Sequence, residues 1–253
     1  SDLQREAFGD NVTRYFPEAL VGNYAVNPHN GYRYWYDYFE RETPNAPALK
    51  DQRARYREWF HEFERCGYTF AMPVVYTWYP TFGWYDFEPK DYRWFYNMML
   101  VASNAGQHTS QQTPIIPFVH WHTTAPPNNP DPSVEQFSRQ NYQELLWHML
   151  LRGHDTFFLW CTGQELATEI QLVHEVYRES LQYNGFINRG VPVLFEVPSK
   201  PGPVVSGLRL GNRVLTRRTD FGMETSNETL ALAGGGEVSV AAKRGMQILT
   251  VKK

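Results

Sequence analysis

The sequence has few cysteines, no long hydrophobic run and no surplus of basic residues. Cys66 and Cys161 are the only cysteines in 253 residues, and their spacing fits neither a zinc site nor a disulfide framework, so we expect two free thiols. No apolar run approaches the roughly 18 residues that a membrane-spanning helix needs. The formal charge of −3 argues against a general nucleic-acid binder. We therefore expect neither membrane nor nucleic acid as a partner.

A glycine-rich phosphate loop is also missing. The three glycines of "AGGGEVSV" (233–240) lie among short strand-like runs, where a hairpin turn explains them. We therefore expect no bound nucleotide, and we expect no other cofactor.

Aromatic residues are abundant instead. They make up 16% of the chain, as 16 Phe, 16 Tyr and 8 Trp, and most of the Tyr and Trp fall between Tyr24 and Trp160. Tyr and Trp combine a flat apolar face with a polar edge, which suits both a packed core and a binding surface.

Up to about residue 190 the pattern strand, loop, helix occurs four times. The predicted strands are 20–26, 68–79, 113–119 and 155–161, and the predicted helices are 46–67, 90–106, 134–153 and 163–187. A capping box of Ser133 and Gln136 is expected to open the third helix. The strands are continuously apolar, which is typical of parallel strands buried on both faces. The fold class is therefore α/β, with (β/α) barrel-type units in residues 1–190.

From Val191 the pattern changes to short alternating runs separated by Gly, Pro and Asn. It predicts a small antiparallel β-domain of five or six strands over residues 191–253. Arg217 and Arg218 are expected on a solvated edge of this domain. The expected core residues are Val193, Phe195, Leu208, Val214, Leu215, Leu230, Val238, Val240, Ile248 and Val251.

Four βα units followed by a β-domain resemble the C-terminal half of a (β/α)8-barrel glycoside hydrolase with an appended β-sandwich. The resemblance is one of layout and aromatic content and covers nearly the whole chain, but no catalytic motif of a specific family is matched. It implies that four further strands come from a second chain, were removed, or come from a copy of this chain. The alternative is an open, doubly wound sheet.

Carboxylates that follow the predicted strands are the candidate catalytic residues, because glycoside hydrolysis commonly uses two of them. The candidates are Asp37, Asp86, Glu88 and Glu165. The aromatic neighbours of Asp37 and Asp86 would desolvate a carboxylate and raise its pKa, as a general acid requires. Helix capping or a surface charge is the alternative for each, and for Glu165 an exposed position in the first helical turn.

The stretch "TPIIPFVHWHTT" (113–124) places His120 and His122 at a strand end, on the same face. Three roles stay open for this pair. The histidines could bind a metal, could form hydrogen bonds with a sugar, or could be purely structural. Asp155, at the start of its strand, lies at the wrong end to complete a metal site. Alternation places Trp121 on the face opposite the histidines, as a stacking platform or turned into the helices.

Aromatic side chains at or beyond strand ends predict platforms for sugar rings, with a packed barrel top as the alternative. Arg33 could hold an acidic sugar. The aromatic candidates are Trp35, Trp78, Tyr79, Trp84, Trp121 and Trp160.

These features together predict a glycoside hydrolase-type enzyme acting on a poly- or oligosaccharide. The alternatives are a non-catalytic carbohydrate-binding or assembly subunit and a metal-dependent hydrolase using His120 and His122. A polysaccharide substrate would favour a secreted or periplasmic location.

Overall fold

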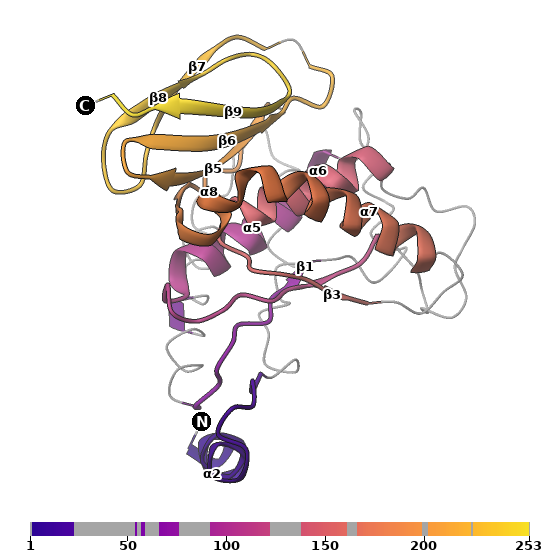
Figure 1. The fold of residues 1–253 in the computed structure, drawn as a ribbon, viewed down its shortest axis with the longest axis vertical. Coiled ribbons are helices and arrows are strands. Elements are labelled where there is room, and N and C mark those ends of the chain that lie inside the picture. Colours follow the sequence, from indigo (N-terminus) through magenta and orange to yellow (C-terminus); the bar gives the residue numbers. More distant parts are fainter. Residues whose placement is uncertain are drawn as a thin grey trace.

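The computed structural model describes residues 2–22, 54, 57–58, 66–75, 92–121, 138–160, 166–198, 202–223 and 225–252. The fold is mixed α/β, with one parallel sheet and two antiparallel sheets (Figure 1). Three consecutive helices lie against the parallel sheet, and the antiparallel sheets form the C-terminal part of the chain.

The parallel sheet contains β1 (Val74–Val75), β2 (Phe118–Val119) and β3 (Phe158–Leu159) in the order β1-β2-β3. Its register pairs Val75 with Val119 and Val119 with Leu159. The parallel pairing is confirmed, but each strand is shorter than predicted. Pro73 and Pro117 supply no backbone donor, so the β1–β2 pairing continues beyond them only as an isolated bridge between Ala71 and Ile115.

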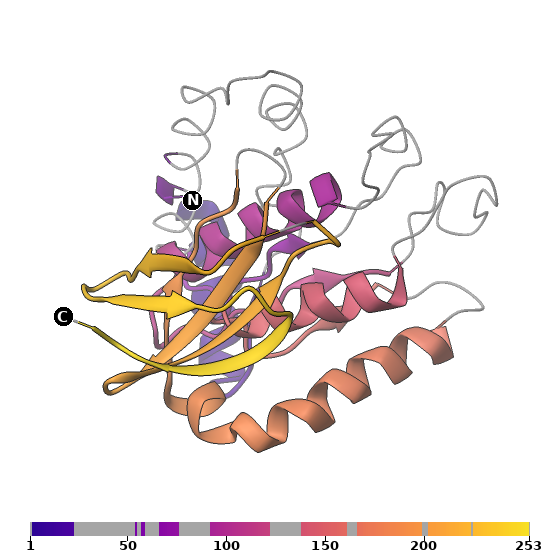
Figure 2. The ribbon, with the colours of Figure 1, turned by 90° about the horizontal axis from the view of Figure 1, so that it is seen from above.

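Helices α5 (Tyr92–His108), α6 (Arg139–Leu150) and α7 (Leu166–Ser180) form one layer on one side of this sheet (Figures 1 and 2). The middle helix, α6, contacts both of its neighbours. Val75, Val119 and Trp147 belong to the core cluster between the sheet and this layer, and Val75 and Val119 are fully buried.

Several helix boundaries differ from the prediction, since α5 continues to His108 and α6 ends at Leu150. Helix α6 begins after Ser138, whose hydroxyl accepts a hydrogen bond from the backbone N–H of Asn141 (3.1 Å), so the helix does not run unbroken from residue 134. Ser133 and Gln136 lie outside the described residues. The long helix predicted to reach residue 187 is broken into α7, a 3₁₀ turn (η5, Leu181–Tyr183) and α8 (Asn184–Arg189). Asn184 and Gly185, both weak helix formers, follow the break.

The N-terminal segment consists of α1 (Asp2–Gln4), the π-helical η1 (Arg5–Asp10) and α2 (Asn11–Tyr15). It packs closely on the turn that precedes β1, because a Cβ placed on Gly9 would lie 2.5 Å from the carbonyl oxygen of Cys66. Residues 20–22 form no strand, although Val21 accepts a hydrogen bond from the Thr69 N–H (2.8 Å). The rest of the predicted strand 20–26 lies outside the described residues.

The C-terminal region contains six antiparallel strands, as predicted. Four form a sheet in the order β4-β5-β6-β9, and two form a hairpin. The strands are β4 (Val191–Leu194), β5 (Val204–Leu210), β6 (Arg213–Thr219), β7 (Glu228–Ala231), β8 (Glu237–Val240) and β9 (Gly245–Thr250). The three glycines between β7 and β8 all have positive φ, which confirms their role in a hairpin turn.

The predicted core of this region is largely correct. Six of the ten residues are buried: Val193, Leu208, Val214, Leu215, Val238 and Val240. Phe195, Leu230 and Val251 are partly buried. Ile248 is 43% exposed, so the prediction was wrong there; it lies on β9, the edge strand of the four-stranded sheet.

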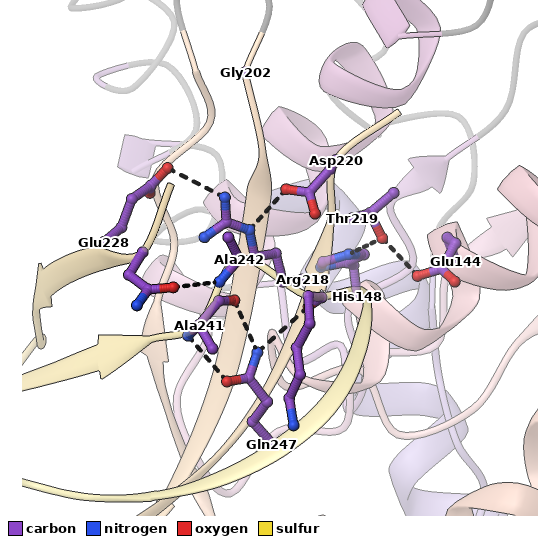
Figure 3. Close-up of polar contacts among 12 residues, drawn as sticks. Glu144, His148, Gly202, Arg218, Thr219, Asp220, Glu228, Ala241, Ala242 and Gln247 are labelled. Atoms are coloured by element: carbon purple, nitrogen blue, oxygen red, sulfur yellow. Dashed lines mark hydrogen bonds and ion pairs between the residues drawn. The ribbon is translucent and has the colours of Figure 1, made fainter. Parts of the chain in front are cut away.

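A row of buried polar residues on α6 attaches this sheet to the helix layer. Glu144 and His148 of α6 are four residues apart and share one helix face, and Arg152 lies in the turn that follows the helix. The Glu144 carboxylate accepts hydrogen bonds from Nε and Nη2 of Arg217, both at 2.8 Å. It also accepts one from the Thr219 hydroxyl (Figure 3). A buried carboxylate is tolerated when its charge is paired and its oxygens accept hydrogen bonds, and Glu144 meets both conditions.

His148 and, in the turn after α6, Arg152 continue the attachment. The His148 ring lies 2.7 Å from the Ser206 hydroxyl and 3.0 Å from that of Thr219. Burial lowers the pKa of His148 well below its usual range, so the ring bridges the two strands in its neutral form. The Arg152 guanidinium donates to Ser206 Oγ (2.8 Å) and to the carbonyl of Phe195 (2.7 Å).

Arg217 and Arg218 do not lie on a solvated edge, which corrects the prediction. Strand β6 is flanked by β5 and β9, so both arginines are on an interior strand. Arg217 lies over the Trp147 ring (5.0 Å) as well as against Glu144. Arg218 is fully buried, and its Nε lies 2.7 Å from Asp220 Oδ1 (Figure 3).

Phe221, which follows β6, attaches the C-terminal sheet to the helix layer at a second point. Phe221 has φ of 54°, a left-handed conformation that is unusual for a bulky residue. Its ring packs edge-on against Phe95 (4.9 Å) and Tyr96 (5.8 Å) of α5. This packing holds the strained turn in place and ties the C-terminal sheet to a second helix of the layer.

We predict that Glu144→Gln destabilises the protein and flattens its acid unfolding. Burial alone would raise the pKa of Glu144, but the hydrogen bonds and charge of Arg217 lower it from 4.5 to about 2. Protonation therefore favours the unfolded chain, so this stabilisation is present above pH 4.5 and is lost as the pH falls toward 2. Its size is about 3 kcal/mol at neutral pH.

Urea titrations between pH 7 and pH 2 measure this effect. We expect Glu144→Gln to remove most of the pH dependence below pH 4.5, whereas Glu18→Gln, at an exposed glutamate, leaves it unchanged. Equal pH profiles for wild type and Glu144→Gln would contradict the assignment.

Candidate functional site

The candidate site lies at the carboxyl edge of the parallel sheet, where parallel α/β proteins place their functional residues. His120 directly follows β2, and Trp160 directly follows β3. The Trp160 backbone N–H donates to the carbonyl of Val119 (2.9 Å), so the two residues stand on adjacent strands at the same level. Of the predicted site residues, His120, Trp121 and Trp160 lie within the described part of the chain, and the structure brings all three to this edge.

A buried carboxylate, Glu169, organises the edge. It lies in the first turn of α7 and is 1% exposed. Its Oε1 accepts hydrogen bonds from the Trp121 backbone N–H (2.9 Å) and from the Tyr142 hydroxyl (2.6 Å), and its Oε2 lies 3.6 Å from Nδ1 of His120. Glu169 therefore joins the end of β2 to both α6 and α7.

This arrangement has a chemical consequence for His120. A carboxylate beside Nδ1 favours the tautomer that carries its proton there and orients the ring, as carboxylates do for histidines in catalytic and metal sites. Both nitrogens of the ring are buried in the structure.

Trp121 points to the helix side of the sheet. Its ring is 7% exposed and lies 6.4 Å from the Tyr142 ring, with the Arg139 guanidinium 5.7 Å from its centroid. The sequence left two options for Trp121, a stacking platform or a side chain turned into the helices. The structure shows the second.

The face of the sheet opposite the helices carries a row of aromatic rings that leads to this edge. Phe70 lies 6.0 Å from Phe158, Phe158 lies 5.2 Å from Phe118, and Phe118 lies 5.7 Å from Trp160. Strand β2 ends at Val119, and the His120 ring beyond it reaches Glu169 of α7. An apolar surface thus adjoins the polar cluster around His120.

Most of the predicted site residues lie outside the described part of the chain, and the structure does not test them. They are Arg33, Trp35, Asp37, Trp78, Tyr79, Trp84, Asp86, Glu88, His122 and Glu165.

The sequence analysis missed Glu169 and Tyr142. A signal for Glu169 was present, because Glu169, Leu172 and Val176 recur at helical spacing and all face the core. A charged residue at a core-facing position must find partners. Tyr142 is likewise a polar group in the core. It is fully buried, and its hydroxyl needs a hydrogen-bond acceptor.

Within the described residues, no group of three or more His, Cys, Asp or Glu is placed to hold a metal ion. The Asp155 carboxylate accepts a hydrogen bond from the Ile115 N–H (2.8 Å), three residues before β3 begins, and so lies at the opposite end of the strands from His120. No helix in the part of the chain that the structure describes is long and apolar enough to cross a bilayer.

Neither a scan against protein-family models nor a search of curated proteins finds a match for this chain. The functional argument therefore depends on the geometry of the site.

We predict that Tyr142→Phe destabilises the protein by about 2 kcal/mol, because it removes a hydrogen bond to a buried, charged acceptor. Chemical denaturation at pH 7 measures the change. Tyr177→Phe, which removes a hydroxyl from a tyrosine that is 60% exposed, is the matched control and should have no effect. Equal stability of the two variants would mean that the Tyr142 hydroxyl does not support Glu169.

Proposed function

We propose that the protein is a carbohydrate-active enzyme of the glycoside hydrolase type, acting on a poly- or oligosaccharide. The observation that supports this most directly is the pairing of His120 with the buried Glu169 at the carboxyl edge, next to Trp160 on the neighbouring strand. A sugar ring presents hydroxyl groups at its rim and an apolar C–H face, and an oriented imidazole beside an indole complements both.

The arrangement of the sheet supports a barrel-type architecture for this proposal. Its strands lie in chain order, and helices α5, α6 and α7 all cover one side. A doubly wound sheet places helices on both sides, whereas a (β/α)8 barrel has consecutive strands and one outer ring of helices. We infer that these units form part of a barrel, with the aromatic row of Phe70, Phe118, Phe158 and Trp160 on its inner side.

In this proposal His120 and Trp160 hold the sugar, and the acid/base carboxylates come from the loops that follow the strands. Asp37, Asp86, Glu88 and Glu165 are the candidates for that role. Glu169 is less suited to it, because its carboxylate already accepts hydrogen bonds from Trp121 and Tyr142 and so serves to position His120.

Because Glu169 is already engaged in hydrogen bonds, the second candidate function is a non-catalytic carbohydrate-binding subunit. The aromatic row and His120 would then bind a glycan without cleaving it. The metal-dependent hydrolase would still need ligands besides His120 and His122, and we rank it third.

We predict that Trp160→Ala and His120→Ala each weaken glycan binding. A panel of neutral and uronic-acid polysaccharides, followed by calorimetry on the best ligand, measures this. Loss of one aromatic contact of about 1 kcal/mol corresponds to roughly fivefold weaker binding. Tyr15→Ala, at an exposed tyrosine of the N-terminal segment, should bind as wild type. Failure of the wild type to bind any glycan would refute the proposal.

We predict that at least one of the variants Asp37→Asn, Asp86→Asn, Glu88→Gln and Glu165→Gln abolishes release of reducing sugar while glycan binding persists. An amide keeps the shape of the carboxylate but can neither donate a proton nor attack the sugar. Reducing-end assays run beside calorimetry distinguish the two functions. Binding without hydrolysis by the wild type would identify the binding subunit.

A further inference from the structure

His148 is a fully buried histidine between helix α6 and strands β5 and β6. Its Nδ1 lies 2.7 Å from the Ser206 hydroxyl of β5, and its Nε2 lies 3.0 Å from the Thr219 hydroxyl of β6 (Figure 3). The Phe95 ring of α5 packs edge-on against it, with 5.5 Å between the ring centres. Both ring nitrogens are therefore engaged, and the groups beyond the two hydroxyls determine which nitrogen carries the proton.

Glu144 fixes the direction of these hydrogen bonds from one end. Arg217 lowers the pKa of Glu144 to about 2, so at neutral pH the carboxylate is charged and can only accept hydrogen bonds. The Thr219 hydroxyl donates its single hydrogen to Glu144. Thr219 must then accept a hydrogen bond from His148, so the proton of the neutral ring lies on Nε2.

Arg152 fixes the direction from the other end. A guanidinium can only donate, and Arg152 Nε lies 2.8 Å from Ser206 Oγ, which therefore accepts. The Ser206 hydroxyl keeps its own hydrogen for Nδ1 of His148, which carries no proton in this tautomer. The hydrogen bonds thus form one ordered chain, in which each hydroxyl accepts once and donates once. The chain runs from Arg152 through Ser206, His148 and Thr219 to Glu144.

A proton added to His148 would break this order. The charged ring donates from both nitrogens, so its new N–H would point at the Ser206 hydroxyl. The hydrogen of Ser206 would have to turn away and would lose its acceptor, which is costly in a buried place.

The surroundings of His148 also oppose a charged ring. Burial of the ring is the strongest reason, and it lowers the pKa of His148 well below the usual range. The charge of Glu144 favours the protonated ring, but three arginines oppose it. They are Arg152 in the turn after α6, Arg217 of β6 and Arg244, which precedes β9.

We propose that His148 makes the docking of the C-terminal sheet on α6 sensitive to mild acid. The docked arrangement requires the neutral ring, whereas a histidine in water takes up a proton near a pH of about 6.5. This contribution to stability is therefore complete above that pH and is lost as the pH falls below it. Each further pH unit disfavours the docked state about tenfold, until the pKa of the docked ring is reached.

Urea titrations at intervals from pH 6.5 to pH 4.5 test the proposal. The wild type is compared with His148→Gln, whose amide can still donate to Thr219 but does not titrate. The unfolding constant of the wild type should rise by about one more factor of ten per pH unit than that of the variant. His154, which is also buried and whose pKa burial lowers to about 4, contributes to both proteins alike. His174→Gln, at an exposed histidine of α7, is the matched control and should keep the wild-type slope.

NMR of the histidine ring nitrogens gives a second readout, on the wild type itself. The signals of His148 are those that His148→Gln lacks, or His148→Asn should the first variant not fold. They should show a proton on Nε2 and none on Nδ1, unchanged for as long as the signals of the folded protein persist. A ring that takes up a proton near pH 6.5 in the folded protein would overturn the proposal. A proton on Nδ1 would also overturn it, as would equal slopes for the wild type and His148→Gln.

Discussion

The buried carboxylate of Glu144 is the contact on which the arrangement of the molecule depends. It lies on the middle helix of the layer and is held by Arg217 and Thr219 of an interior strand, 73 and 75 residues later in the chain. A buried charge left without its partner is strongly destabilising, so the C-terminal sheet can dock on α6 in only one register without a large penalty. Phe221 then fixes the same sheet to α5.

The candidate site is also built around a buried, hydrogen-bonded carboxylate. Glu169 is buried at the start of α7, where it accepts hydrogen bonds from a backbone N–H and a tyrosine hydroxyl and lies 3.6 Å from an imidazole nitrogen. Tyr142, which holds Glu169, and Glu144, which holds the C-terminal sheet, are two residues apart on α6. One short, rigid helix therefore connects the two carboxylate clusters. The position of His120 depends on packing that extends to the C-terminal sheet, which explains why a site at a strand end is accompanied by so large a buried polar network.

Several parts of the fold could be predicted because they depend on local pattern. Continuous apolar runs predicted parallel strands, and alternating runs predicted five or six antiparallel strands with Val214 and Val238 in their core. The burial of Arg217 and Arg218 could not be predicted in the same way. Whether a charged side chain is buried depends on a partner far away in the sequence, and neither arginine carries a local sign of it. Glu169 differs, because its helical spacing with Leu172 and Val176 marks a core-facing position. The first two strands are shorter than predicted for a different reason. Prolines interrupt their hydrogen bonding, although the runs are apolar throughout.

The two faces of the parallel sheet explain the position of the proposed site. Strands that are apolar on both faces need cover on both, and α5, α6 and α7 supply it on one face. The other face carries Phe118, Phe158 and Trp160, with Phe158 partly in contact with water. In a closed barrel these rings would line the interior beneath the carboxyl edge.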